Sequence, residues 1–175
     1  MLFVGDLSDG DLRLTRRIAS LPYPLAVILG NHDLGRDRSG GILRQQLALL
    51  GETHCGWTQR GWHQPAIGLV GARPGSAGGG FHLSRAVQAV YGPITLEQSA
   101  DRIVAAAAAV SADQPLIVMA HCGPVASGPR PTAPAGVTGN RRRWTGAIRI
   151  SPSPWIGWLG SVARIWWSSA TCIIS

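Results

Sequence analysis

Three stretches of sequence decide the fold: FVGDLSD at 3–9, LGNHD at 29–33 and VMAHCGP at 118–124. Each stretch begins in an apolar run and leads to an oxygen or imidazole side chain. Parallel strands present side chains in this way at the carboxyl edge of a sheet. We therefore expect Asp6, Asn31 and His121 to converge at one edge. A carboxylate, an amide oxygen and an imidazole together suit one divalent metal ion.

The first 124 residues read as one α/β domain. Apolar runs predict strands at 2–4, 25–29, 67–70 and 116–119. Capping residues and apolar spacing predict helices from Asp9 or Asp11 to about 21, and at about 42–50, 84–91 and 95–112. Strands and helices alternate along this part of the chain with mostly short connections, which is typical of an α/β fold.

Residues 125–175 have a different composition from the rest of the chain. The sequence has a net charge of +7, and all sixteen basic residues are Arg. The tail holds six of these Arg, five of the seven Trp and no acidic residue, and it shows no periodicity. We therefore predict an irregular tail that does not extend the sheet.

Each candidate residue also has a simpler interpretation. An Asp after a strand is commonly a turn or a helix cap, and Asp9 could be only the N-cap of the first helix. A single His after a strand, such as His121, is usually structural. For Arg73, a solvated side chain is the simpler interpretation. The metal site is favoured because GDxxD and GNHD stand one strand–helix unit apart and a strand-end His follows.

In this order, GDxxD at 5–9, GNHD at 30–33 and AHCGP at 120–124 resemble the calcineurin-like metallophosphoesterases, most closely a branch known from cyanobacteria and plastids. The resemblance implies an incomplete four-layer α/β/β/α sandwich over residues 1–124. It implies hydrolysis of phosphate esters with two divalent ions, Mn, Fe or Zn. Asp6, Asn31 and His121 would be metal ligands, His32 the proton donor, and Asp9 the residue that orients His32.

The chain departs from the family pattern at both ends. The family begins with a strand ending in D-x-H, expected before Asp6, and closes its site with G-H-x-H; the sequence contains neither motif at these places. One ion would keep Asp6, Asn31 and His121, and the other would keep only Asp6. We therefore expect a phosphoesterase that is truncated at the N-terminus and is weak or inactive.

A shift of reading frame near Val125 would explain the tail. Reading the third base of each codon with the first two of the next forces Asp at Trp144-Thr145 and at Trp155-Ile156, and Val at Trp166-Trp167. With free codon choice elsewhere, the shifted frame can encode a G-H-x-H motif. We expect DNA sequencing across this point to decide whether 125–175 is an out-of-frame tail.

A second hypothesis is a non-enzymatic protein that binds nucleic acid through its tail. Arg neutralises phosphates and Trp stacks on unpaired bases, and Arg141-Arg142-Arg143-Trp144 is the best support for it. On the main hypothesis the partner is a phosphate-ester substrate, without nucleic acid or membrane. No signal peptide is visible, and Arg164 interrupts the most apolar tail stretch, so we expect a cytoplasmic protein.

Overall fold

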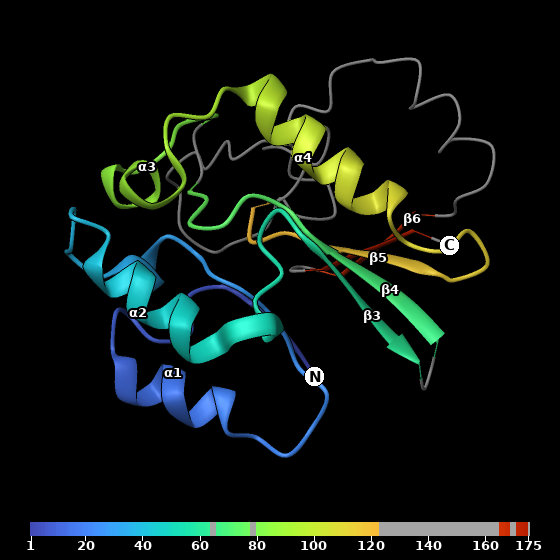
Figure 1. Cartoon of the computed structure of the whole chain (residues 1–175), viewed down its shortest axis with the longest axis horizontal. Helices are drawn as coiled ribbons and strands as arrows, with labels where there is room; N and C mark the ends of the chain where they lie inside the picture. The colour runs from blue at the N-terminus through green and yellow to red at the C-terminus, as the bar shows by residue number, and fades with distance from the viewer. Residues whose placement is uncertain (64–65, 78–79, 123–164, 169–170, 175) are drawn as a thin grey trace.

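The computed structural model describes residues 1–63, 66–77 and 80–122, and the backbone of 165–168 and 171–174 (Figure 1). The helices are α1 (Leu12–Ala19), α2 (Gly41–Leu50), α3 (Arg85–Tyr91) and α4 (Leu96–Ala108), with 3-10 turns η1 (His32–Leu34) and η2 (Gly51–Thr53). The strands are β1 (Leu2–Val4), β2 (Ala26–Ile28), β3 (Gln59–His63), β4 (Ala66–Gly71), β5 (Leu116–Met119), β6 (Ile165–Ser168) and β7 (Thr171–Ile174).

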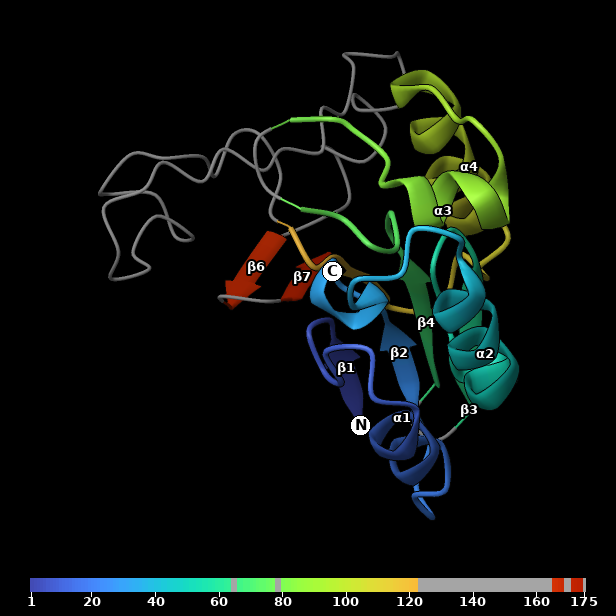
Figure 2. The same cartoon turned by 90° about the vertical axis from the view of Figure 1, so that its left-hand side faces the viewer.

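The strands form two sheets (Figure 2). β1 and β2 pair in parallel, with Val4 opposite Ile28. The second sheet has the order β3-β4-β5-β7-β6, in which β4 and β5 are parallel and the other neighbours are antiparallel. Helices and two sheets make a mixed α/β fold, as the sequence predicted.

Side-chain caps fix where several helices begin. The Asp11 carboxylate accepts from the backbone N–H of Arg13 and starts α1, so Asp9 is not its cap. At the start of α4, Thr95 and Gln98 form a reciprocal capping box. The predicted helices are therefore confirmed, with boundaries a few residues from those expected.

Opposite faces of β2 contribute to two hydrophobic clusters. Val27 and Leu29 pack with Ile18 of α1 and with Leu43 of α2. On the other face, a second cluster joins β2 to β4 and β5; its members include Ala26, Ile28, Leu69 and Met119. β2 is thus buried between the helices and the second sheet, which explains why it is continuously apolar.

Backbone contacts beyond the strands hold the ends of the two sheets together. Val27 forms an isolated bridge with His54, and Gly30 forms one with Ser76. The backbone N–H of Gly75 also donates to the Leu29 carbonyl at 2.7 Å. The chain that leaves β4 therefore runs beside the chain that leaves β2.

The structure corrects two expectations. β3 was not predicted, because Gln59–His63 has no apolar run; it forms by pairing with β4 and alternates between exposed and half-buried residues. The tail was expected not to extend the sheet, but β7 pairs with β5 and β6 pairs with β7. For these two strands the prediction of an irregular tail is wrong; residues 123–164 lie outside the described chain.

None of the described helices is long and apolar enough to cross a membrane. The cytoplasmic location stays a prediction.

Candidate metal centre

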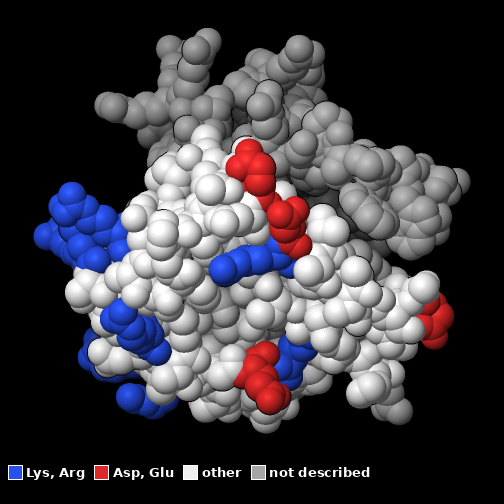
Figure 3. Space-filling model, turned by 45° about the horizontal axis from the view of Figure 1, so that its top comes forward, with Lys and Arg blue, Asp and Glu red and all other residues white. Residues whose placement is uncertain are grey.

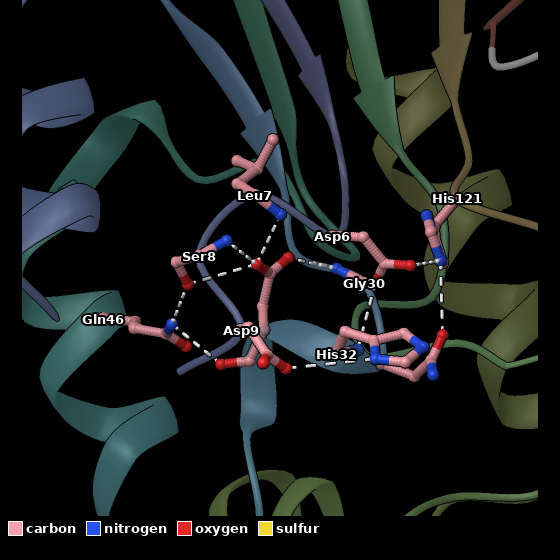
Figure 4. Close-up of polar contacts among 10 residues, drawn as sticks. Asp6, Leu7, Ser8, Asp9, Gly30, His32, Gln46 and His121 are labelled. Carbon is pink, nitrogen blue, oxygen red and sulfur yellow. Dashed lines mark hydrogen bonds and ion pairs between the residues drawn. The ribbon is translucent and has the colours of Figure 1, made fainter. Parts of the chain in front are cut away.

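Three chain segments bring the candidate ligands to one place (Figure 4). Asp6 follows β1, Asn31 follows β2, and His121 follows β5. His121 Nε2 lies 3.4 Å from Asp6 Oδ2 and 3.3 Å from Asn31 Oδ1. The convergence that the sequence predicted is therefore confirmed.

The turn after β1 has an unusual backbone. Gly5 and Asp6 both have positive φ, 84° and 53°, and Asp6 is one of the few non-glycine residues in this region among those described. A left-handed conformation costs a non-glycine residue roughly 1–2 kcal/mol. It turns the Asp6 carboxylate back toward β2, where Oδ1 accepts from the backbone N–H of His32 at 3.0 Å. Such strain tends to be kept at functional sites.

Gly30 is needed because other groups approach its backbone closely. A Cβ at this position would lie 2.7 Å from the Asp6 nitrogen and 2.9 Å from His121 Nε2. Any side chain at Gly30 would therefore occupy the space between Asp6 and His121. This contact gives the glycine of GNHD a physical role beyond the turn itself.

A backbone carbonyl orients the ring of His121. Nδ1 lies 3.0 Å from the Val4 carbonyl oxygen, which can only accept, so Nδ1 carries the proton. Nε2 of the neutral ring then presents a lone pair to Asp6 Oδ2 and to Asn31 Oδ1. Acceptor atoms that face one another repel unless a cation lies between them. A carbonyl that orients a ring in this way is typical of metal-bound histidine.

The spacing of these atoms fits a divalent ion. With ligand distances of about 2.0–2.2 Å, separations of 3.3 and 3.4 Å correspond to ligand–metal–ligand angles of about 105°. Asp6 and His121 are only partly buried, with side chains 37% and 17% exposed, so an ion and a substrate could enter. The residues present therefore fit one metal ion.

His32 and Asp9 flank this site on the solvent side. The His32 ring is 61% exposed, and its Nδ1 lies 3.9 Å from Asp9 Oδ1. This separation is an electrostatic contact and is too long for a hydrogen bond. The structure brings the two side chains together, while the orienting role of Asp9 stays a prediction.

Comparison with known protein families agrees with this geometry. Residues 1–145 match the family of calcineurin-like phosphoesterases. The chain belongs to this family. Membership implies metal-dependent phosphoester hydrolysis as the general activity. No match was found among curated proteins or among solved structures. The particular branch stays a prediction.

The Asp33 carboxylate joins two turns of the site through hydrogen bonds, a role that the sequence did not predict. Asp33 is fully buried, and its Oδ1 accepts from the backbone N–H groups of Leu7 and Ser8 at 2.6 and 2.8 Å. Its Oδ2 accepts from the backbone N–H of Gly30 at 2.8 Å. Asp33 therefore ties the turn after β1 to the turn after β2. The signal in the sequence was its place at the end of GNHD.

A buried glutamine supports the same network. The Gln46 side-chain nitrogen donates to the Ser8 hydroxyl and to the Asp33 carbonyl, each at 2.9 Å. Its position on α2 gives no sign of this contact in the sequence.

Arg73 corrects a further expectation. The sequence favoured a solvated side chain, but Arg73 is only 4% exposed. Its guanidinium donates to the His82 carbonyl and lies 4.9 Å from the centre of the Phe81 ring. Burial lowers the pKa of this guanidinium. The expectation failed because the ring and the carbonyl take the place of water.

Proposed function

We propose that this phosphoesterase hydrolyses phosphate esters with Asp6, Asn31 and His121 as the ligands of one divalent ion, Mn, Fe or Zn. The observation that carries the proposal is the convergence of His121 Nε2 with Asp6 Oδ2 and Asn31 Oδ1, at 3.4 and 3.3 Å. Because Nδ1 is engaged with Val4, the imidazole cannot satisfy either oxygen as a donor while it stays neutral.

When bound, the ion would supply a Lewis acid for the phosphoryl oxygens. The protein residues supply placement and a proton. Asp6 Oδ1 accepts from the backbone N–H of His32, so this hydrogen bond fixes the carboxylate relative to the turn that carries His32. His32 would donate a proton to the leaving oxygen, and Asp9 Oδ1 lies 3.9 Å from its Nδ1.

We further propose that turnover is slow. Among the described residues, no group of three or more His, Cys, Asp or Glu side chains could hold a metal ion, and we assign only Asp6 to a second one. With one proposed ligand, a second ion would exchange readily, and the protein would lose most of the advantage of a paired site.

The test measures Mn²⁺ binding by calorimetry together with turnover of 4-nitrophenyl phosphate and bis(4-nitrophenyl) phosphate. Asn31→Ala and His121→Ala should each weaken Mn²⁺ binding, whereas His63→Ala, an exposed histidine on β3, should not. His32→Ala should leave Mn²⁺ affinity unchanged and lower kcat by about 10²–10⁴-fold. Equal Mn²⁺ affinity in all variants would refute the ligand assignment.

The alternative of nucleic-acid binding through the tail has no support from the comparisons. The residues that would support it, Arg141–Trp144, lie outside the described residues. A gel shift with nucleic acid would support this alternative if it weakens with salt and is lost on deletion of 125–175.

A further inference from the structure

A hollow of about 600 Å³ adjoins the proposed metal site. This volume is in the range of small-molecule sites, roughly 300–1,000 Å³. We name it the arginine hollow and define it by six of its lining residues: Asn31, Arg36, Arg38, Gly75, His82 and Arg85. Asn31 belongs to both places, so a molecule with one end at the proposed metal ligands could extend into the arginine hollow.

Three positive charges line this hollow. Arg36 and Arg38 follow η1, and Arg85 begins α3; all three are exposed. Within the described residues none of them makes a side-chain hydrogen bond or ion pair, in contrast to Arg13, which pairs with Asp11 at 2.8 Å. Figure 3 shows blue side chains gathered at the left-hand edge of the face in view, the side on which Figure 1 places α3.

One acidic residue, Asp37, also lines the hollow, but it does not neutralise these charges through an ion pair. Asp37 Oδ2 accepts from the backbone N–H of Ile42 at 2.9 Å, and Oδ1 accepts from the Ser39 hydroxyl at 2.7 Å. These hydrogen bonds hold the pKa of Asp37 at about 2. The carboxylate is therefore occupied by the start of α2, and the guanidinium groups stay available to a ligand.

We propose that the arginine hollow binds a second phosphoryl group of the substrate, so that the preferred substrates are small bisphosphates. This inference rests on the function proposed above, because the first phosphoryl group must lie at Asp6, Asn31 and His121. Guanidinium groups match phosphate oxygens with paired N–H donors, which a neutral lining could not do. Because the arginine hollow adjoins the proposed metal site, it would contact the part of the substrate that lies beyond the phosphate being hydrolysed.

The experiment compares two probes by calorimetry with the full Mn²⁺-loaded protein: fructose 1,6-bisphosphate and fructose 6-phosphate. The test variant is Arg36→Gln/Arg38→Gln. The control, Arg16→Gln/Arg17→Gln, removes the same charge from two exposed positions on α1. Because both variants have equal net charge, a difference between them reports local recognition. Arg85→Gln tests the third charge separately.

We expect the unmodified protein to bind the bisphosphate about 10-fold more tightly or better than the monophosphate, as charged hydrogen bonds of this kind allow. The test variant should lose this preference and keep its affinity for fructose 6-phosphate, and the control should keep both. No preference in the unmodified protein, or equal loss in the control, would overturn the inference.

The two proposals fail differently. If fructose 6-phosphate binds in a Mn²⁺-dependent way that Asn31→Ala abolishes, but the bisphosphate has no advantage, only the arginine hollow is refuted. If the protein binds neither Mn²⁺ nor either sugar phosphate, the proposed function falls and the inference falls with it.

Discussion

Asp33 links the turns that carry Asp6 and Asn31, although it is not itself a proposed ligand. Both of its oxygens accept from buried or partly buried N–H groups. Asp33→Asn keeps the shape but turns one acceptor into a donor, which then faces an N–H group. We expect a loss of about 2 kcal/mol or more in the free energy of unfolding, measured with urea.

Asp101→Asn is the matched control, because Asp101 is exposed on α4 and makes no side-chain hydrogen bond to another described residue. It should change the free energy of unfolding by less than about 0.5 kcal/mol. A similar small loss for Asp33→Asn would mean that the turns hold their shape without the carboxylate.

Gly30 gives a second prediction at this scale. Gly30→Ala places a methyl group 2.9 Å from His121 Nε2 and 2.7 Å from the Asp6 backbone, so the proposed ligands must separate. We expect Mn²⁺ affinity to fall by about 10-fold or more, as happens when ligand orientation is lost. Gly61→Ala on β3 is the control, since a Cβ there meets nothing within 4 Å. Unchanged Mn²⁺ binding in Gly30→Ala would argue against a site between Asp6 and His121.

Among the elements, the segment between η2 and β3 connects the two sheets. It contains His54, whose protonation is unfavourable in the folded protein. His54 bridges to Val27, and burial lowers its pKa to about 4. Its Nε2 is buried and has no partner among the described residues. Between about pH 6.5 and pH 4 the unfolded chain therefore binds a proton that the folded chain refuses.

The free energy of unfolding should consequently decrease as the pH falls through this window, by as much as about 2–3 kcal/mol from His54 alone. His54→Gln should flatten that part of the profile, and His63→Gln, at an exposed position, should not. Urea titrations at several pH values provide the measurement. Parallel profiles for the parent and His54→Gln would show that folding does not lower the pKa of His54.

In the whole molecule, β7 from the tail covers the edge that β5 would otherwise expose in the second sheet. β7 covers β5 with an antiparallel ladder from Leu116 opposite Ile174 to Met119 opposite Thr171. Truncation after residue 164 would leave β5 with unpaired backbone groups, and an open edge strand promotes association. We expect the truncated protein to self-associate at lower concentration in light scattering. Equal monomer fractions would mean that β7 does not protect the edge in solution.

The local sequence was sufficient to predict the four helices, four of the strands and the position of the proposed ligands. The strands β1, β2, β4 and β5 were predictable because each is a short apolar run next to a glycine or proline residue, a pattern typical of strands. Asp6, Asn31 and His121 were predictable because strand ends fix where a side chain emerges. The local chain carries this information without reference to distant residues.

Contacts between distant parts of the chain set the structure where the local sequence gave no signal. β3 lacks an apolar run and is a strand because β4 supplies its hydrogen bonds. Arg73 is buried because Phe81 and the His82 carbonyl replace its water. Asp33 joins two turns because its carboxylate accepts hydrogen bonds from three of their backbone N–H groups. In each case the local sequence does not show which group becomes the partner. Burial and pairing therefore could not be predicted from the local pattern.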